Sequence, residues 1–204
     1  MNILSIDFDW IMEPSIEAYN NLVNTDSLFG PIELWDKIQN VIPNINPECN
    51  LDHFNILYFL IKKYSKHLTA NDYYIALSHG DLYNFMEQIN DKKYVVYNID
   101  HHHDLGYNIQ YNDLDNTTPN LANWAYHANK NLNMYKYVWI HNNNSCMPEK
   151  VPEKLKYIHT TDLNILENVK FDKIFICASW EWVPLKYQNL FAILTSLFDD
   201  LKNK

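Results

Sequence analysis

The hydrophobic residues of this chain fall into short runs that alternate with longer segments of helical periodicity. The short runs are rich in β-branched and aromatic residues, as is typical of buried strands; they are Asn2–Ile6, Tyr73–Leu77, Tyr94–Ile99, Tyr137–Ile140, Lys156–His159 and Lys173–Cys177. The spacing of an amphipathic helix occurs at Ile16–Leu22, Ile32–Val41, Phe54–Tyr64, Leu82–Ile89, Leu121–Leu132 and Leu185–Leu201. Strands that alternate with helices predict an α/β fold, with helices on both faces of a mainly parallel sheet.

Length and composition predict a single domain. The chain has 204 residues, of which 47% are apolar, enough for one sizeable core but cramped for two. It shows no internal repeat and no linker. We therefore expect one domain over residues 1–204.

The charge pattern narrows the choice of partners. The net charge is -9 with histidines neutral, and the 16 basic residues form no dense cluster, which argues against nucleic acid or an anionic membrane and favours a cationic substrate. No stretch approaches the roughly 20 apolar residues of a membrane span, and the N-terminal segment lacks the pattern of a secretory signal. We expect a cytoplasmic protein, and homo-oligomerisation stays open.

The number and spacing of the cysteines and glycines argue against several common kinds of binding site. Cys49, Cys146 and Cys177 are widely spaced and odd in number, which indicates reduced thiols rather than a disulfide framework or a zinc site. The chain has only three glycines, so neither a dinucleotide-binding motif nor a P-loop can be assembled.

Four of the predicted strands run directly into ionisable residues. The groups that follow them are Asp7 with Asp9, His79, the segment Asp100–Asp104, and Glu181. A single Asp in such a place is commonly a helix N-cap, and a lone His is commonly a surface or core residue. The carboxyl ends of parallel strands share one edge of the sheet, however, and ligands bind at that edge. The set of four therefore predicts one site.

The spacing within these segments predicts the chemistry. Asp100, His102 and Asp104 lie two residues apart, so their side chains point to one side while the backbone stays extended, and Asp7 and Asp9 do the same. With His79 they make four carboxylates and two imidazoles, a set that suits two divalent ions of the Mn²⁺ class. Two such ions lower the pKa of a water molecule enough to make it a nucleophile. His101 and His103, on the other side, are expected to be supporting or structural.

Two segments resemble motifs of the arginase and agmatinase (ureohydrolase) superfamily. The run D-H-H-H-D at 100–104 is similar to its D-x-H-x-D motif, and S-I-D-F-D-W-I-M-E-P at 5–14 is similar to S-x-D-x-D-x-x-D-P with one extra residue. The run E-W-V-P at 181–184 resembles the late E-V-N-P segment of the family. The D-x-D motif opens this chain but comes late in arginases, so the resemblance implies a circular permutation, as in the UPF0489-type peptide arginases.

The resemblance also implies roles for individual residues. Asp100 and Asp7 would bridge two Mn²⁺ ions, His79 and Asp104 would complete one coordination sphere, and His102 and Asp9 the other. Glu181 would bind the guanidinium group of the substrate. The whole chain would then be one arginase-like catalytic domain.

The histidine that moves protons in this family has no matching motif in the chain. His141, at the end of a predicted strand, and His127, within a predicted helix, are the candidates for this role. Trp10, Trp180 and Trp182 flank the expected ligands and could stack on an alkyl guanidinium, although core packing accounts for them equally well.

The hypothesis from the sequence is a Mn²⁺-dependent peptide arginase, which converts arginine in a ribosomally made precursor peptide to ornithine and releases urea. Two alternatives stay open. One is a hydrolase with the same metal site that acts on free arginine or agmatine, or as a deacetylase-type amidohydrolase. The other is a peptide-binding module without catalysis.

Overall fold

Six parallel strands form the central sheet of the protein, in the order β4-β8-β1-β5-β6-β7. The computed structural model describes residues 1–13, 47–89, 93–107 and 111–199. The strands are β1 (Asn2–Asp7), β4 (Tyr73–Ala76), β5 (Tyr94–Ile99), β6 (Met134–Ile140), β7 (Lys156–Thr160) and β8 (Lys173–Cys177). Each overlaps one of the predicted runs, although β6 begins at Met134 rather than at Tyr137, so the predicted α/β fold is confirmed.

A second, two-stranded antiparallel sheet follows the end of β1. It pairs β2 (Met12–Glu13) with β3 (Glu48–Cys49), and a 3-10 turn at Phe8–Ile11 joins β1 to β2. The sequence did not predict these strands, because two residues carry no periodicity.

The helices are α3 (Leu51–Tyr64), α4 (Asp81–Ile89), α5 (Tyr111–Leu114), α6 (Trp124–Asn131) and α7 (Gln188–Ser196). In the described part of the chain, no helix is long and apolar enough to cross a lipid bilayer. The helices predicted at Ile16–Leu22 and Ile32–Val41 lie outside the described residues.

Two helices are shorter than predicted at their N-terminal ends. α6 begins at Trp124 rather than Leu121, because the side chains of Asn120 and Asn123 bond to backbone N–H groups of residues 122 and 120 and form a turn there. α7 begins at Gln188 after a 3-10 turn at Leu185–Tyr187. The spacing of apolar residues in the sequence does not indicate such turns.

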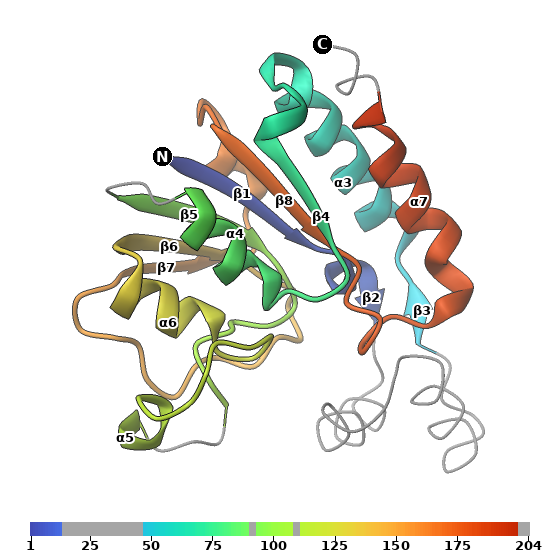
Figure 1. Ribbon diagram of the computed structural model, residues 1–204. Helices are drawn as coiled ribbons and strands as arrows, with labels where there is room; N and C mark the ends of the chain where they lie inside the picture. The colour runs from blue at the N-terminus through green and yellow to red at the C-terminus, as the bar shows by residue number, and fades with distance from the viewer. Residues whose placement is uncertain (14–46, 90–92, 108–110, 200–204) are drawn as a thin grey trace.

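The helices form a layer on each face of the sheet (Figure 1): α3 and α7 on one, α4 and α6 on the other. Side chains of β1 alternate between the two cores, with Leu4 and Ile6 in the first and Ile3 in the second. The same alternation continues in β5, where Val96 belongs to the second core. Polar residues an even number of positions from Ile3 or Val96 in these strands therefore lie on the face of the sheet that α4 and α6 cover.

Candidate metal centre

The carboxyl ends of β1 and β5 bring acidic side chains together on that face. Ser5 and Asp7 lie two and four residues after Ile3, and Asn98 and Asp100 lie two and four residues after Val96, so all four point to the same face as Ile3 and Val96. Ser5 lies opposite Asn98 in the parallel ladder, so the next pair along, Asp7 and Asp100, lies at the edge of the sheet. Both carboxylates are buried, with exposed fractions of 3% and 0%.

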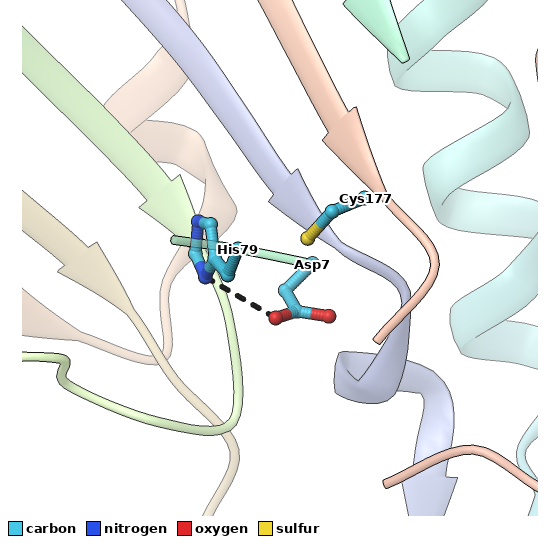
Figure 2. Close-up of side chains that lie close together, drawn as sticks. All are labelled: Asp7, His79 and Cys177. Atoms are coloured by element: carbon cyan, nitrogen blue, oxygen red, sulfur yellow. Dashed lines mark ion pairs between the residues drawn. The ribbon is translucent and has the colours of Figure 1, made fainter. Parts of the chain in front are cut away.

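The first of two clusters surrounds Nδ1 of His79, which follows β4. This nitrogen lies 3.2 Å from Asp7 Oδ2, 3.0 Å from Asp100 Oδ2 and 2.9 Å from Asp104 Oδ2. It is buried, yet none of these oxygens is placed to form a hydrogen bond with it. Figure 2 shows that His79 and Cys177 both point toward Asp7. Three carboxylate oxygens therefore lie around this imidazole nitrogen, and His79, Asp100 and Asp104 form one group of possible metal ligands.

The second cluster surrounds Nδ1 of His102, which lies 2.7 Å from Asp9 Oδ2 and 3.8 Å from Asp100 Oδ1. Asp100 belongs to both clusters, with Oδ2 in the first and Oδ1 in the second. Asp7 was expected to be shared too; its Oδ2 lies beside His79, its Oδ1 accepts a hydrogen bond from the backbone N–H of Asp9 (3.1 Å), and its sharing stays a prediction. In this arrangement Asp100 is the carboxylate that contacts both imidazoles.

Neighbouring side chains hold the acidic groups in these orientations. Ser179 Oγ donates to Asp7 Oδ2 (2.7 Å), Asn98 Nδ2 donates to Asp100 Oδ2 (2.9 Å), and Trp124 Nε1 donates to Asp104 Oδ2 (2.6 Å). Asp100 Oδ1 accepts from the backbone N–H of His102 (2.7 Å). Partners of this kind fix the rotamers of metal-binding residues.

The two imidazoles are held differently. Ser5 Oγ and His79 Nε2 share a hydrogen bond of 2.9 Å, which leaves Nδ1 of the same ring directed at the carboxylates. The ring of His102 packs against the indole of Trp182, with ring centroids 4.4 Å apart. Both imidazoles are therefore fixed in place by the fold.

The packing of carboxylates shifts their pKa values in opposite directions. Burial raises the pKa of Asp100 to about 7, assisted by the charges of Asp104 and Asp7. Burial and the same kind of repulsion raise the pKa of Asp9. For Asp7, burial is outweighed by His79 and by hydrogen bonds from Ser179 and the Asp9 backbone, so its pKa is lowered. Burial and mutual repulsion thus disfavour the charged forms of Asp9 and Asp100.

Two groups of these residues could each hold a metal ion: His79 with Asp100 and Asp104, and His102 with Asp9 and Asp100. Around an ion with octahedral ligands at about 2.1 Å, neighbouring ligand atoms lie about 3.0 Å apart, which agrees with the 2.9 to 3.2 Å separations around His79 Nδ1. Oxygen and imidazole ligands suit Mn²⁺-class ions. Cys177 lies near His79 and Asp7, but burial raises the pKa of its thiol and its Sγ–H faces the carbonyl of Ile6, which leaves a neutral thiol beside the ligands.

One premise of the sequence prediction was wrong. The backbone does not stay extended through Asp104, which has a φ of 50°, in the left-handed region that Asp tolerates better than most residues. The turn is held where the Asp104 carbonyl accepts from the Ala125 N–H (3.1 Å) and its carboxylate accepts from Trp124. Asp104 reaches the first cluster because of this turn.

His101 and His103 lie outside the two clusters, as expected. The backbone N–H of His101 donates to Asp9 Oδ1 (3.3 Å), and the His103 ring stacks on Tyr107 with centroids 4.1 Å apart. Burial and the neighbouring His102 lower the pKa of both imidazoles to about 3. These neutral rings support the segment that carries the acidic residues.

A small cavity of about 20 Å³ opens beside the first cluster. Asp7, Asp104, Glu181, Tyr107 and Trp182 are among its lining residues. Burial raises the pKa of Glu181, and the charge of Asp7 adds to the effect. The structure thus brings Glu181 to the cluster, in a space that holds about one water molecule.

Trp10 and Trp180 were expected to contact the substrate, but unlike Trp182 they do not line the small cavity. Trp10 is buried and stacks on His53, with centroids 4.5 Å apart. Trp180 packs edge-on against Phe8 and Phe191. Neither lines the small cavity, because the turns that follow β1 and β8 direct both rings away from it.

The two candidate histidines for proton transfer also lie apart from the clusters. His127 is on α6, where Nε2 is 3.1 Å from Thr117 Oγ1 and the ring packs edge-on against Tyr83. These contacts are with residues outside both clusters, and a role of His127 in proton transfer stays a prediction. His141 follows β6 and shares a larger cavity with His101.

Sequence reasoning missed the residues that orient the ligands. Ser5 and Asn98 gave a signal, because each is a polar residue inside an otherwise apolar strand, and both are fully buried. Ser179 and Trp124 gave none, since their contacts join segments 172 and 20 residues apart.

Gly80 offers a test of how tightly the first cluster is built. A Cβ at this position would lie 2.9 Å from Leu121 N and 3.0 Å from the carbonyl carbon of Asn120, both backbone atoms. We expect Gly80→Ala to cost about 1–3 kcal/mol of folding free energy and to weaken metal binding, because the adjacent His79 must shift. Urea unfolding and titration with Mn²⁺ measure both effects. Ser78→Ala, two positions away, is the matched control and should change neither; equal effects of both variants would contradict this account.

Comparisons of the chain with protein-family models, with curated proteins and with solved structures found no match.

Proposed function

We propose that this protein is a hydrolase that binds two divalent metal ions at the carboxyl edge of its sheet. The observation that carries the proposal is Asp100, whose two oxygens face two different imidazoles in a fully buried cluster. His79, Asp7 and Asp104 would hold one ion together with Asp100, and His102 and Asp9 would hold the other with it. Such ions, taken to be Mn²⁺, lower the pKa of a water molecule and polarise the group under attack.

The lining of the small cavity supports a cationic substrate. Three carboxyl groups, those of Asp7, Asp104 and Glu181, face it from different segments, and the chain as a whole has a net charge of -9. Glu181 could bind a guanidinium group in a bidentate, charge-assisted contact. This supports hydrolysis of the guanidinium group of arginine to ornithine and urea, in agreement with the sequence resemblance.

The size of the cavity sets a condition on substrate entry. A volume of about 20 Å³ holds one water molecule but not a guanidinium group. The half-buried rings of Tyr107 and Trp182 line this space, so the entry of an arginine side chain requires the cavity to widen. Trp182 would then pack against the entering cation.

We further propose that the arginine belongs to a peptide, namely a ribosomally made precursor, and that His141 is the better placed of the two histidines to exchange protons. The peptide substrate is supported by the resemblance to peptide arginases. His141 is supported by its cavity, which it shares with His101 of the ligand segment.

Mass spectrometry tests the proposed reaction. Arginine-containing peptides incubated with Mn²⁺ and the protein should lose the mass of cyanamide per converted arginine and release one urea. The sequence contains no arginine, so any ornithine found after total hydrolysis comes from the added peptide. Glu181→Gln should raise KM at least about tenfold through loss of a charged contact, while the number of bound ions stays the same.

The same experiment separates the alternatives. Urea from free arginine or agmatine but not from peptides would support a small-molecule ureohydrolase, and deacetylation of acetyl-lysine peptides would support an amidohydrolase. Protein that binds no Mn²⁺ in elemental analysis would refute the proposal.

A further inference from the structure

Two imidazoles outside the candidate metal centre face each other at the β7 side of the sheet. His141 directly follows β6, and His159 belongs to β7, the strand at the edge of the sheet. Nε2 of His141 lies 3.4 Å from Nδ1 of His159. Neither residue belongs to the two clusters around His79 and His102.

The pairing of β6 with β7 brings these two rings together. Trp139 of β6 lies opposite His159 in the parallel ladder. The backbone N–H of His141 donates to the carbonyl of Thr160 (2.9 Å), which extends the pairing past the end of β6. His141 lies two residues after Trp139, so its side chain points to the same face of the sheet as those of Trp139 and His159. The approach of the two imidazoles is therefore a consequence of backbone pairing.

Aromatic rings on the same face support both imidazoles. The ring of His141 packs on Trp139 with centroids 4.5 Å apart, and that of His159 stacks on Tyr157 at 5.9 Å. The two imidazole planes lie within 26° of each other. His141 is buried and His159 is exposed, so the pair combines a fixed ring with one that solvent reaches.

A backbone carbonyl determines the tautomer of His141. Its Nδ1 lies 2.8 Å from the carbonyl oxygen of Asn142, and a carbonyl oxygen only accepts hydrogen bonds. In the neutral ring the proton is therefore on Nδ1, and the lone pair is on Nε2, the atom that faces His159. Histidines that bind metals commonly donate their other ring N–H to a carbonyl in this way.

The distance between the two facing nitrogens favours a shared ion over a direct hydrogen bond. Hydrogen bonds from N–H donors usually span about 2.7 to 3.2 Å between heavy atoms, and 3.4 Å is longer. Two ligands of a tetrahedral ion with bonds of about 2.0 to 2.1 Å lie about 3.3 to 3.4 Å apart. The spacing of His141 and His159 agrees with the second arrangement.

The donor atoms indicate the kind of ion. Both are imidazole nitrogens, which suit zinc, whereas manganese is suited to carboxylate-rich sites such as the one around Asp100. Water would complete the coordination of the ion, because His159 is exposed. The net charge of -9 on the chain attracts cations to its surface.

We propose that His141 and His159 form a separate binding site for Zn²⁺. The ion joins the edge strand β7 to β6 at their carboxyl ends, through Nδ1 of His159 and Nε2 of His141. This site does not depend on the proposed hydrolase function, because it shares no ligand with the two clusters. A zinc ion on Nε2 of His141 occupies the lone pair that proton transfer by this ring would require.

Calorimetric titration with Zn²⁺ at pH 8 tests the site in the full-length chain. Imidazoles bind metals in their neutral form, so His159→Gln should remove one bound ion per chain or weaken its binding at least tenfold. His67 is also exposed, and its Nε2 lies 2.7 Å from the carbonyl oxygen of Phe171. His67→Gln is the matched control and should bind zinc as the wild type does. Equal zinc binding by the wild type and His159→Gln, or an equal loss in both variants, overturns the proposal.

A double variant shows whether the two imidazoles hold the same ion. His141→Gln should remove the ion that His159→Gln removes, and the two substitutions together should remove no more than either alone. Residues that share one partner are not additive in this way. Losses that add would mean two independent sites and would contradict a shared ion.

Anomalous X-ray scattering from zinc-soaked crystals locates the ion directly. A peak should lie within about 2.1 Å of Nε2 of His141 and Nδ1 of His159, and crystals soaked in Mn²⁺ should show none there. Absence of the zinc peak, or an equal manganese peak, overturns the proposal. A zinc peak at this pair without any ion bound at Asp100 would remove the proposed metal centre and leave this site.

Discussion

Asp100→Asn should abolish the binding of both metal ions and all turnover. Loss of a residue that merely supports a ligand costs 10- to 100-fold in metal affinity, and Asp100 contacts both imidazoles directly, so we expect a loss of more than about 100-fold. Elemental analysis after dialysis against Mn²⁺ measures the bound ions, and urea release measures turnover. Retention of two ions per chain would refute the assignment of Asp100.

In the absence of metal, the Asp100→Asn substitution should not harm the protein: we expect no loss of folding stability. The pKa of Asp100 is raised to about 7 by burial and by Asp104 and Asp7, which means that its charged form is unfavourable in the folded chain. An amide of the same shape removes that charge and can still accept at Oδ1 from the His102 N–H. In a chelator at pH 8, Asp100→Asn should therefore be at least as stable as the wild type. Asp52→Asn, exposed on α3, is the control and should keep normal metal binding.

Removal of metal from the wild-type protein should lower its melting temperature substantially. A ligand at 100 times its dissociation constant stabilises the folded state by about 2.7 kcal/mol, which for a chain of this length corresponds to about 5 to 10 °C. The buried carboxylates of the cluster add to the effect, because without cations their mutual repulsion persists in the folded state only. Thermal unfolding with Mn²⁺ and with a chelator measures the difference. Equal melting temperatures in both would contradict a metal centre.

The size of this stabilisation should depend on pH. A carboxyl group with a pKa of about 7, as for Asp100, must lose its proton before it can bind a cation. Metal affinity should therefore rise as the pH increases from about 6 to about 8 and level off above the pKa. In Asp100→Asn the melting temperature should not respond to Mn²⁺ at either pH.

The sequence alone predicted much of the framework. The runs at β1, β5 and β8 are apolar, β-branched and short, so their own composition identifies them as buried strands. Parallel strands place their carboxyl ends at one edge, so the sequence predicts that six residues meet there: Asp7, Asp9, His79, Asp100, His102 and Asp104. The structure brings these six residues together.

Other features depended on contacts between distant segments. The order of the strands places β1 between β5 and β8, and Ser179 reaches Asp7 across 172 residues of sequence. The turn at Asp104 depends on α6, whose Trp124 and Ala125 hold it. Local periodicity carries no information on such pairs.

The alternation of side chains along β1 and β5 is a local property of an extended backbone, and for that reason the sequence by itself determined which side chains of these two strands face the candidate metal centre. Which oxygen of Asp100 faces which imidazole, which tryptophan lines the small cavity and which histidine lines the larger one depend on how loops pack after the strands end. Only the tertiary structure decided these, because side-chain direction in a loop is set by neighbours from other parts of the chain.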